Sequence, residues 1–557
     1  MASTDSIPEN HATETSPLLG NGKHGPNVEA NENGRPENGN QSRGERHESE
    51  VPLAEEPTTG KLLVVMGSIW FGTFLAALDS TIVATLSAPI SNSFKSLSLL
   101  SWLASAYFIS QAASQPLSGR LTDIFSRRTG LVVSNILFAS GNLICGLAKE
   151  EWVMIFGRVV AGAGGGGLTA ISTFVGSDLV PLRRRGVWQG IGNISYGVGA
   201  GVGGVFGGWI NDTWGWRKAF LIQVPLTVIS GILVFFVVKI PVKHSEKSAL
   251  KRVDFLGAFT LITALVLLLL GINSGGNIVP WNHPLVYVTI PLSIVFLLVY
   301  IYIEDRRASE PIIPVRLLLN RTVLSACLTN WFFAMTTFAL LFYGPLYFQV
   351  KGLSATQAGA RMIPQSVGIA IGSVTAGLIM RLTGRYYILS VCIVSIFIAA
   401  NVLTSTFTLT TPTWEAIIAI FLLGIGYAGM LTTTLLALIS AVDHKDQAVI
   451  TSASYVFRST GSAIGITIVS AVFQNILKLR LWSRFGDQEG AADLIKKLRD
   501  SLDEIEKLPV GLKGVGRDVY MDALRGVFLT SLGIGILGAL VSLAMREHVL
   551  HRNLERK

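Results

Sequence analysis

Long apolar runs separated by short polar segments dominate the chain from Lys61 onward. Fourteen of these runs are about 20 residues long or longer, the length that a helix needs to cross a hydrocarbon core of about 30 Å. The pattern predicts an all-α membrane protein with fourteen spanning helices, at 61–88, 100–119, 130–148, 152–174, 186–210, 217–239, 253–273, 284–303, 322–349, 357–381, 386–407, 414–440, 447–475 and 522–545.

Lys and Arg gather in alternate loops of this pattern. The loops on the other side hold little beyond Lys95, Lys149 and Lys351. Because positively charged loops stay in the cytoplasm, the alternation predicts that both termini are cytoplasmic. The residues that carry this signal are Arg127, Arg128, Arg183 to Arg185, Lys239, Lys243, Lys247, Lys251, Arg252, Arg306, Arg307, Arg316, Arg321, Arg381 and Arg385.

The composition agrees with this class of protein. Of the 557 residues, 50% are hydrophobic and 15% are charged, which excludes a single soluble core. The net charge of +9 sits mostly in short loops, so we expect a lipid bilayer and not nucleic acid as the partner. The three cysteines lie in apolar runs without metal or disulfide spacing, and no nucleophile and base are arranged for catalysis. We expect no cofactor, no metal and no enzymatic activity.

The first 60 residues differ from the rest. They contain no Phe, Trp or Tyr, which predicts a disordered cytoplasmic tail. Within them, Glu14, Leu18 and Leu19 form a pattern that resembles the acidic dileucine signal that adaptor complexes read in sorting to lysosomes and vacuoles. The alternative is a chance occurrence in a flexible tail. Residues 546–557 form a second short cytoplasmic tail.

One cytoplasmic turn, Gly119 to Gly130, reads GRLTDIFSRRTG between two apolar runs. It resembles the signature loop between helices 2 and 3 of the major facilitator superfamily, a family of secondary transporters. The matching residues include Gly119, Asp123, Arg127 and Arg128, while Ser126 replaces a usual glycine. The resemblance implies a gate at the cytoplasmic side.

The segment from Gly377 to Arg385 repeats this loop in reduced form, which indicates two related halves. The resulting plan resembles the fourteen-helix, drug:proton antiporter branch of the superfamily. It implies a six-helix bundle at 61–240, a linker with two inserted helices at 241–319, and a second bundle at 320–545. In the fifth predicted helix, Gly204 stands where that branch usually has proline.

Three charged residues lie deep in predicted spans, where a charge is costly and therefore indicates function. Asp79 lies about 27 Å from the cytoplasmic start of its helix, and Arg158 lies about 9 Å from the non-cytoplasmic end of its own helix. Their depths in the membrane are therefore comparable. A carboxylate held away from water can exchange a proton for an organic cation, unless Asp79 pairs permanently with Arg158 or caps a kink. Arg458, close to mid-membrane, can meet a substrate carboxylate or belong to a structural pair.

Polar and aromatic residues in the same region are candidates for the wall of the substrate cavity. Each is also typical of a hydrogen bond between packed helices. They are Tyr107, Gln111, Asn193, Asn330 and Tyr427.

The last lumenal loop is predicted at 475–521 and contains an amphipathic pattern from Leu494 to Leu508. This pattern predicts a helix that lies on the membrane surface or covers the transport path. On the same side, Asn211 begins a glycosylation sequon close to the bilayer.

A narrower resemblance concerns Trp216 to Pro225. Gln223 before Val-Pro, together with the dileucine pattern, is similar to the vacuolar basic amino acid transporters of fungi. We therefore expect a proton-coupled transporter that moves lysine, arginine or histidine into the vacuole. A plasma-membrane exporter of drugs or toxins is the first alternative, and an amino-acid sensor without transport is the second.

Overall fold

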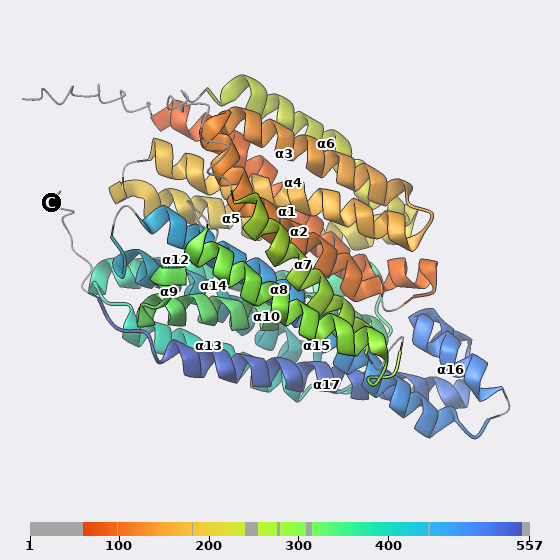
Figure 1. Ribbon diagram of the computed structural model, residues 1–557. Helices are drawn as coiled ribbons and strands as arrows, with labels where there is room; N and C mark the ends of the chain where they lie inside the picture. The colour runs from red at the N-terminus through yellow and green to blue at the C-terminus, as the bar shows by residue number, and fades with distance from the viewer. Residues whose placement is uncertain are drawn as a thin grey trace, which may run out of the picture. The chain divides into compact units, whose positions relative to one another are not determined.

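The computed structural model describes residues 59–96, 99–180, 182–239, 254–275, 279–307, 315–443, 446–488 and 490–548 (Figure 1). All the secondary-structure elements assigned in these residues are helices. The dileucine pattern of Glu14, Leu18 and Leu19 lies outside the described residues, and so do the ends of both predicted tails. The expected all-α class is confirmed.

The helices fall into three groups along the chain. The first group comprises α1 (Thr59–Phe94), α2 (Leu99–Ile124), α3 (Arg127–Leu147), α4 (Glu151–Leu179), α5 (Leu182–Trp214) and α6 (Trp216–Val237). The second is a hairpin of α7 (Phe255–Ser274) and α8 (Pro284–Arg306), which is followed by the short α9 (Val315–Leu318). The third comprises α10 (Arg321–Val350), α11 (Ala355–Ala360), α12 (Ile363–Thr383), α13 (Tyr387–Ser405), α14 (Thr413–Ser440), α15 (Gln447–Phe485), α16 (Ala491–Asp500), the 3₁₀ helix η3 (Leu502–Lys507) and α17 (Val510–Ser542).

Helices lie at all fourteen expected stretches, but fewer meet the criteria for a span. Within the described residues, 12 helices are long and apolar enough to cross a membrane. The helices α2 and α5 are not among them, although they contain 26 and 33 residues, because their sequences are richer in polar residues and glycine. The count of fourteen spans and the cytoplasmic position of both termini therefore stay predictions.

One expected helix is interrupted. The stretch predicted at 357–381 consists of α11 and α12, which are separated by Arg361 and Met362. Pro364 follows at the start of α12, where its missing N–H and its ring prevent an unbroken helix from the preceding turn. The prediction of one unbroken helix at 357–381 was therefore wrong.

The predicted lumenal loop at 475–521 is largely helical, which corrects the expected boundary. The helix α15 continues to Phe485 and α17 begins at Val510, so only a short connection remains, and it contains α16 and η3. Ile495 and Leu498 of α16 are buried against the protein, and the Tyr520 hydroxyl donates a hydrogen bond to the Leu498 carbonyl at 2.5 Å. The amphipathic helix α16 therefore packs against α15 and is hydrogen-bonded to α17.

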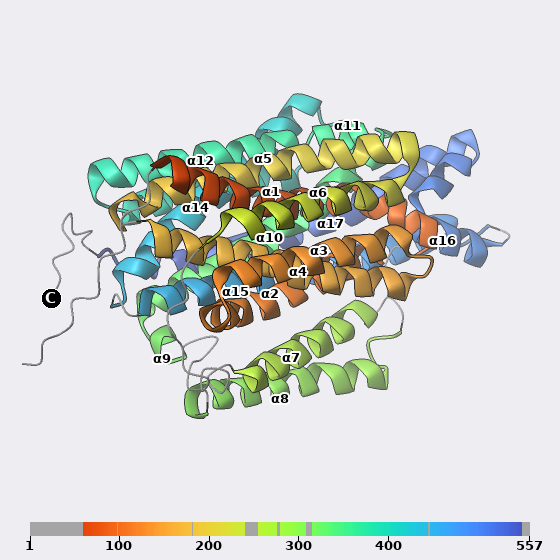
Figure 2. The same ribbon diagram turned by 90° about the horizontal axis from the view of Figure 1, so that it is seen from above.

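The two groups of long helices each pack mainly among themselves. In the first group α4 contacts α2 and α3, and α1 contacts α5. In the other group α14 contacts α12 and α13, and α10 contacts α15 and α17. The α7–α8 hairpin lies along the outside, where α7 contacts both α2 and α15 (Figure 2). This arrangement fits a 6+2+6 plan.

A close seam joins α5 to α11 at the non-cytoplasmic end predicted from the loops. A Cβ atom added to Gly359 would lie 2.2 Å from the Gly204 carbonyl oxygen, so the two backbones are in contact there. About two helical turns beyond Gly204 on α5, the Asp212 carboxylate accepts hydrogen bonds from the Thr356 N–H at 3.1 Å and from the Thr356 hydroxyl at 2.5 Å. The glycine that replaces the expected proline at position 204 thus supports close contact between the helix groups.

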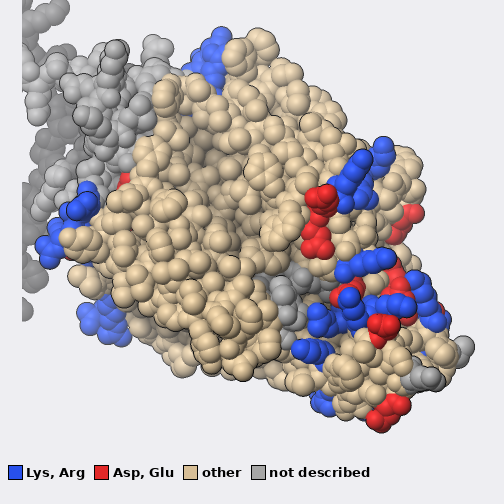
Figure 3. Space-filling view, turned by 45° about the vertical axis from the view of Figure 1, so that its right-hand side comes forward, with Lys and Arg blue, Asp and Glu red and all other residues tan. Residues whose placement is uncertain are grey.

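The outer surface is mostly apolar. Large hydrophobic side chains, such as Leu298 and Tyr302 of α8, are more than half exposed, as expected for residues that face lipid. In the space-filling view, Lys, Arg, Asp and Glu gather at the end that carries α16 and η3 (Figure 3). Exposed charges there include Lys496, Lys497, Glu506 and Lys507.

Ser126, the departure from the signature loop, occupies an unusual backbone conformation. Its φ and ψ are 150° and 155°, a region that residues other than glycine rarely adopt. Its side chain caps α3 by accepting a hydrogen bond from the Thr129 N–H at 3.0 Å. The backbone therefore retains a conformation suited to glycine, while serine supplies a cap.

We expect Ser126→Gly to raise the free energy of unfolding by about 1 kcal/mol. Glycine removes strain of about 1–3 kcal/mol, and as an N-cap it is only slightly worse than serine. Thermal unfolding of the purified protein in detergent measures the effect. Ser126→Ala is the matched control, because it keeps the strain, loses the cap and should destabilise by about 1 kcal/mol. Equal destabilisation by both substitutions would contradict the assignment of strain.

Candidate transport site

A buried ion pair joins α1 to α4. The Nη1 atom of Arg158 lies 2.7 Å from Oδ2 of Asp79, and the two side chains are 1% and 0% exposed. The sequence predicted only that the two residues lie at comparable depth, and the structure brings them into direct contact. Their roles in transport stay predictions.

Arg158 is held by α2 as well as by Asp79. Its Nε donates a hydrogen bond to the Leu103 carbonyl at 3.2 Å, and its guanidinium lies 4.3 Å from the centre of the Tyr107 ring. Three different groups therefore fix the guanidinium, through an ion pair, a hydrogen bond and a cation–π contact.

The glycine run of α4 makes this arrangement possible. A Cβ atom added to Gly162 would lie 2.3 Å from the Tyr107 carbonyl oxygen, and one added to Gly165 would lie 2.3 Å from the Tyr107 hydroxyl. Small residues thus allow α2 and α4 to approach closely, as in other membrane helix pairs. The approach brings Tyr107 and the Leu103 carbonyl within reach of Arg158.

The second oxygen of Asp79 differs from the first. Within the described part of the chain, Oδ1 is buried and has no hydrogen-bond partner. A buried acceptor without a partner is costly, and it is a position where a proton or a cationic donor would be stabilising. Asp79 therefore has one oxygen paired with Arg158 and a second buried oxygen without a partner in the described residues.

Arg458 lies apart from this pair, on α15. It is half-buried, and its guanidinium lies 4.6 Å from the centre of the Tyr455 ring. Tyr196 of α5 and Tyr427 of α14 are within its electrostatic range. No salt bridge to Arg458 is found in the described ranges.

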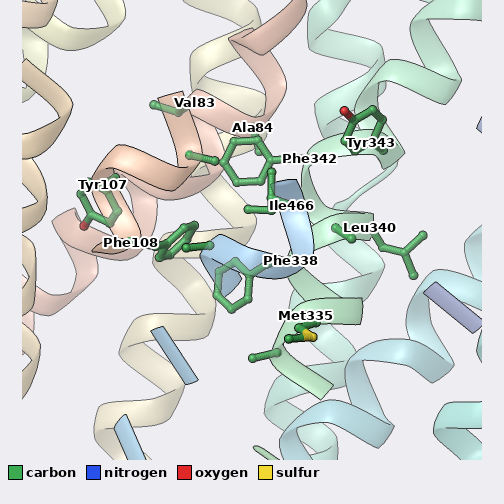
Figure 4. Packing of buried hydrophobic residues seen from close by; sticks show 14 of the residues in the cluster. Val83, Ala84, Tyr107, Phe108, Met335, Phe338, Leu340, Phe342, Tyr343 and Ile466 are labelled. Atoms are coloured by element: carbon green, nitrogen blue, oxygen red, sulfur yellow. The ribbon is translucent and has the colours of Figure 1, made fainter. Parts of the chain in front are cut away.

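A row of aromatic rings leads from the buried pair toward Arg458. Tyr107 and Phe108 lie at 5.5 Å between ring centres, Phe108 and Phe338 at 4.8 Å, and Phe338 and Tyr427 at 6.4 Å, all nearly edge-to-face. Figure 4 shows Tyr107, Phe108 and Phe338 in the packed core. The row crosses from α2 to α10 and α14, so it spans both helix groups.

Two of the predicted cavity residues make contacts between helices. Asn330 donates to the Ser454 hydroxyl at 3.0 Å and accepts from the Thr434 hydroxyl at 3.2 Å. Asn193 donates to the Ser373 hydroxyl at 3.4 Å. These bonds are those of packed helices, the alternative considered for these positions. Gln111 is half-buried, and Tyr427 is buried beside Phe338.

The sequence did not identify two pairs of residues that connect the helix groups near this site. Gln115 accepts a hydrogen bond from the Ser459 hydroxyl at 3.1 Å, and the Ser105 and Thr467 hydroxyls lie 2.9 Å apart. Gln115 lies one helical turn beyond Gln111. The periodicity of α2 is therefore the signal in the sequence that could have identified it.

The signature loop forms a network at the other end of α2 and α4. Arg127 binds Asp178 through Nε at 2.9 Å and donates to the Thr122 hydroxyl at 2.7 Å. The guanidinium of Arg128 lies 4.0 Å from the centre of the Phe235 ring. Gly119 and Asp123 lie in α2, but the surroundings of Gly119 and the side chain of Asp123 are not described, so their part in the predicted gate stays a prediction.

Asn211 lies in the last turn of α5. Its side chain donates to the Asp212 carboxylate at 3.2 Å, and the hydroxyl of Thr213 in the same sequon donates to the Trp209 carbonyl at 2.8 Å. Glycosylation needs an accessible, extended sequon, so this helical setting does not favour modification of Asn211.

Comparison with known proteins agrees with this architecture. The sequence pattern of the Major Facilitator Superfamily matches residues 69–466. A bacterial homologue of the human lysosomal transporter Spinster, solved in an inward-facing and unoccupied conformation, superposes with a TM-score of 0.61 at 16% identity, over 88% of this chain and 98% of that one. This likeness concerns the fold alone.

Three fungal relatives are considerably more similar in sequence. Multidrug resistance protein fnx1 of Schizosaccharomyces pombe is 37% identical over 91% of this chain and 97% of its own length. The vacuolar membrane amino acid uptake transporter fnx2 of the same yeast is 34% identical over 86% and 83%. Vacuolar basic amino acid transporter 2 of Saccharomyces cerevisiae is 33% identical over 68% and 82%.

The helical bundle with its long apolar spans defines a multi-pass membrane protein of the transporter class. Because the family pattern covers most of the described core and the relatives match nearly the whole chain, the protein belongs to the Major Facilitator Superfamily. The predicted family is confirmed, and the relatives include both kinds of protein that the sequence suggested.

We expect Asp79→Asn and Arg158→Gln each to lower the free energy of unfolding by about 3–5 kcal/mol, because each leaves a buried charge without its partner. The double variant should lose less than the sum, since no uncompensated charge remains. Thermal unfolding in detergent, analysed as a double-mutant cycle, measures the coupling. Additive losses would contradict a direct pair.

Proposed function

We propose that this protein is a proton-coupled transporter that moves basic amino acids into the vacuole. The observation that supports this most directly is the buried Asp79 carboxylate, with one oxygen on Arg158 and the other without a partner. The unpartnered oxygen of this carboxylate can accept either a proton or a cationic hydrogen-bond donor, but not both at once.

This competition provides the coupling. When the site faces an acidic lumen, a proton neutralises Oδ1 of Asp79, and the substrate cation leaves. When the site faces the cytoplasm, the proton is released and an ammonium or guanidinium group takes its place. In the structure Arg158 is bound to Oδ2, to the Leu103 carbonyl and to the Tyr107 ring, so it positions the carboxylate for this exchange. The bundles alternate about this site, in the manner of transporters with related halves.

The relatives support basic amino acids as the substrate and the vacuole membrane as the location. The vacuolar proteins of both yeasts are named as transporters of amino acids, and that of Saccharomyces cerevisiae as a transporter of basic amino acids. A cationic side chain is also the chemistry that a buried carboxylate selects. The predicted dileucine pattern at Leu18 and Leu19 would direct the protein to the vacuole through a sorting adaptor.

A drug exporter is the second candidate, because fnx1, named as a multidrug resistance protein, is 37% identical over nearly the full length. Many drugs are organic cations and would also bind a buried carboxylate. Both candidates move their substrate out of the cytoplasm, and they differ in the membrane and in the substrate.

Isolated vacuolar vesicles provide the test of transport. We expect ATP-dependent uptake of lysine that a protonophore abolishes, and loss of that uptake in Asp79→Asn. Uptake is expressed per amount of protein in the vesicles, so that lower stability of the variant is not mistaken for lost coupling. Asp518→Asn is the matched control, because Asp518 is exposed and forms no salt bridge within the described residues.

Two results would count against the proposal. Normal proton-driven uptake by Asp79→Asn would remove Asp79 from the mechanism. No lysine uptake by correctly located wild-type protein would favour the drug exporter.

The location is tested separately. A fluorescent fusion should label the vacuole membrane, and replacement of Leu18 and Leu19 by Ala should move it to the cell surface. A fusion that labels the cell surface from the outset would argue for the exporter, whereas a variant that stays at the vacuole would exclude the dileucine pattern as the signal.

A further inference from the structure

Arg458 carries a positive charge near the middle of a predicted span. It lies 11 residues after the start of α15, about 16 Å along the helix axis. A charge at this depth is expensive unless it is paired or faces a polar cavity. Arg158 meets this requirement through Asp79, but no comparable carboxylate contacts Arg458 in the described residues.

The groups around Arg458 stabilise a cation without occupying its hydrogen-bond donors. Tyr455 contributes a ring face at 4.6 Å, and its hydroxyl lies 3.3 Å from that of Thr173 on α4. An aromatic face attracts the guanidinium but does not match the paired N–H donors of its edge. A carboxylate fits that edge with two parallel hydrogen bonds.

The packed rings from Tyr107 to Tyr427 form an apolar, aromatic row that leads from the buried pair to the helix group that carries Arg458. Tyr196 lies within electrostatic range of both Tyr107 and Arg458, so the two charged sites share one neighbourhood. Asp79 belongs to the first helix group and Arg458 to the last. A molecule with a cation, an aliphatic chain and a carboxylate matches this sequence of environments.

We propose that Arg458 binds the carboxylate of the substrate and thereby restricts the transporter to cations that also carry a carboxylate. This inference rests on the proposed function, in which Asp79 binds the cationic group. The substrate then contacts both helix groups through opposite charges. A cation without a carboxylate contacts only the Asp79 side.

Arginine and its decarboxylated analogue agmatine provide the test, because both present a guanidinium group and only arginine presents a carboxylate. The competition of unlabelled arginine and of agmatine against the uptake of labelled arginine in vacuolar vesicles measures how strongly each compound binds. In the wild type we expect agmatine to compete at least about 30-fold more weakly than arginine, the effect of removing one partner of a buried charge pair. In Arg458→Gln this preference should nearly disappear, because arginine binds more weakly while agmatine binding is unchanged.

Two further variants complete the design. Arg458→Lys keeps the charge without the paired donors and should retain an intermediate preference. Arg484→Gln removes an exposed charge from the other end of the same helix, and it should leave the preference unchanged.

The outcomes separate this inference from the function it rests on. Equal competition by agmatine and arginine in the wild type would overturn the assignment of Arg458, whether or not any variant folds. Equal weakening of both ligands in Arg458→Gln would assign Arg458 a structural role and overturn it as well. Absence of arginine uptake by wild-type protein in the vacuole membrane would overturn the proposed function and this inference together.

Discussion

The attraction between Asp79 and Arg158 determines how the helices around them pack. Two charges without water are tolerated only when they are in contact and when their remaining donors and acceptors are met. Arg158 satisfies this through Leu103 and Tyr107, which requires α2 to lie against the glycine face of α4. The unusually small residues of α4 are therefore a consequence of the electrostatics as much as of the packing.

This requirement is met only in part for the carboxylate. Arg158 has hydrogen bonds from both Nε and Nη1, whereas Oδ1 of Asp79 has no partner in the described part of the chain, so the pair is asymmetric. Under the proposed function, this asymmetry separates two tasks: Arg158 positions the carboxylate, and Asp79 retains an oxygen for exchange. A transporter needs both, because a carboxylate that moved with every proton would not define a fixed binding site.

Much of this arrangement follows from the sequence. Apolar runs gave the helices, and depth along them placed Asp79 and Arg158 at one level. The break between α11 and α12 was missed because a proline near the start of an apolar run does not change its hydropathy, and the extension of α15 and α17 was missed because their ends are polar. Which oxygen of Asp79 is paired, and whether Gln111 or Gln115 connects the helix groups, depends on helix rotation, which a single sequence does not determine.

The inserted hairpin has a consequence for motion. Since α7 touches α2 on one side and α15 on the other, it lies across the line along which the two helix groups meet. If those groups tilt in opposite directions, α7 must slide along at least one neighbour at every cycle. Lipids that fill or leave this sliding contact would then influence the turnover rate, so the composition of the surrounding bilayer becomes part of the transport kinetics.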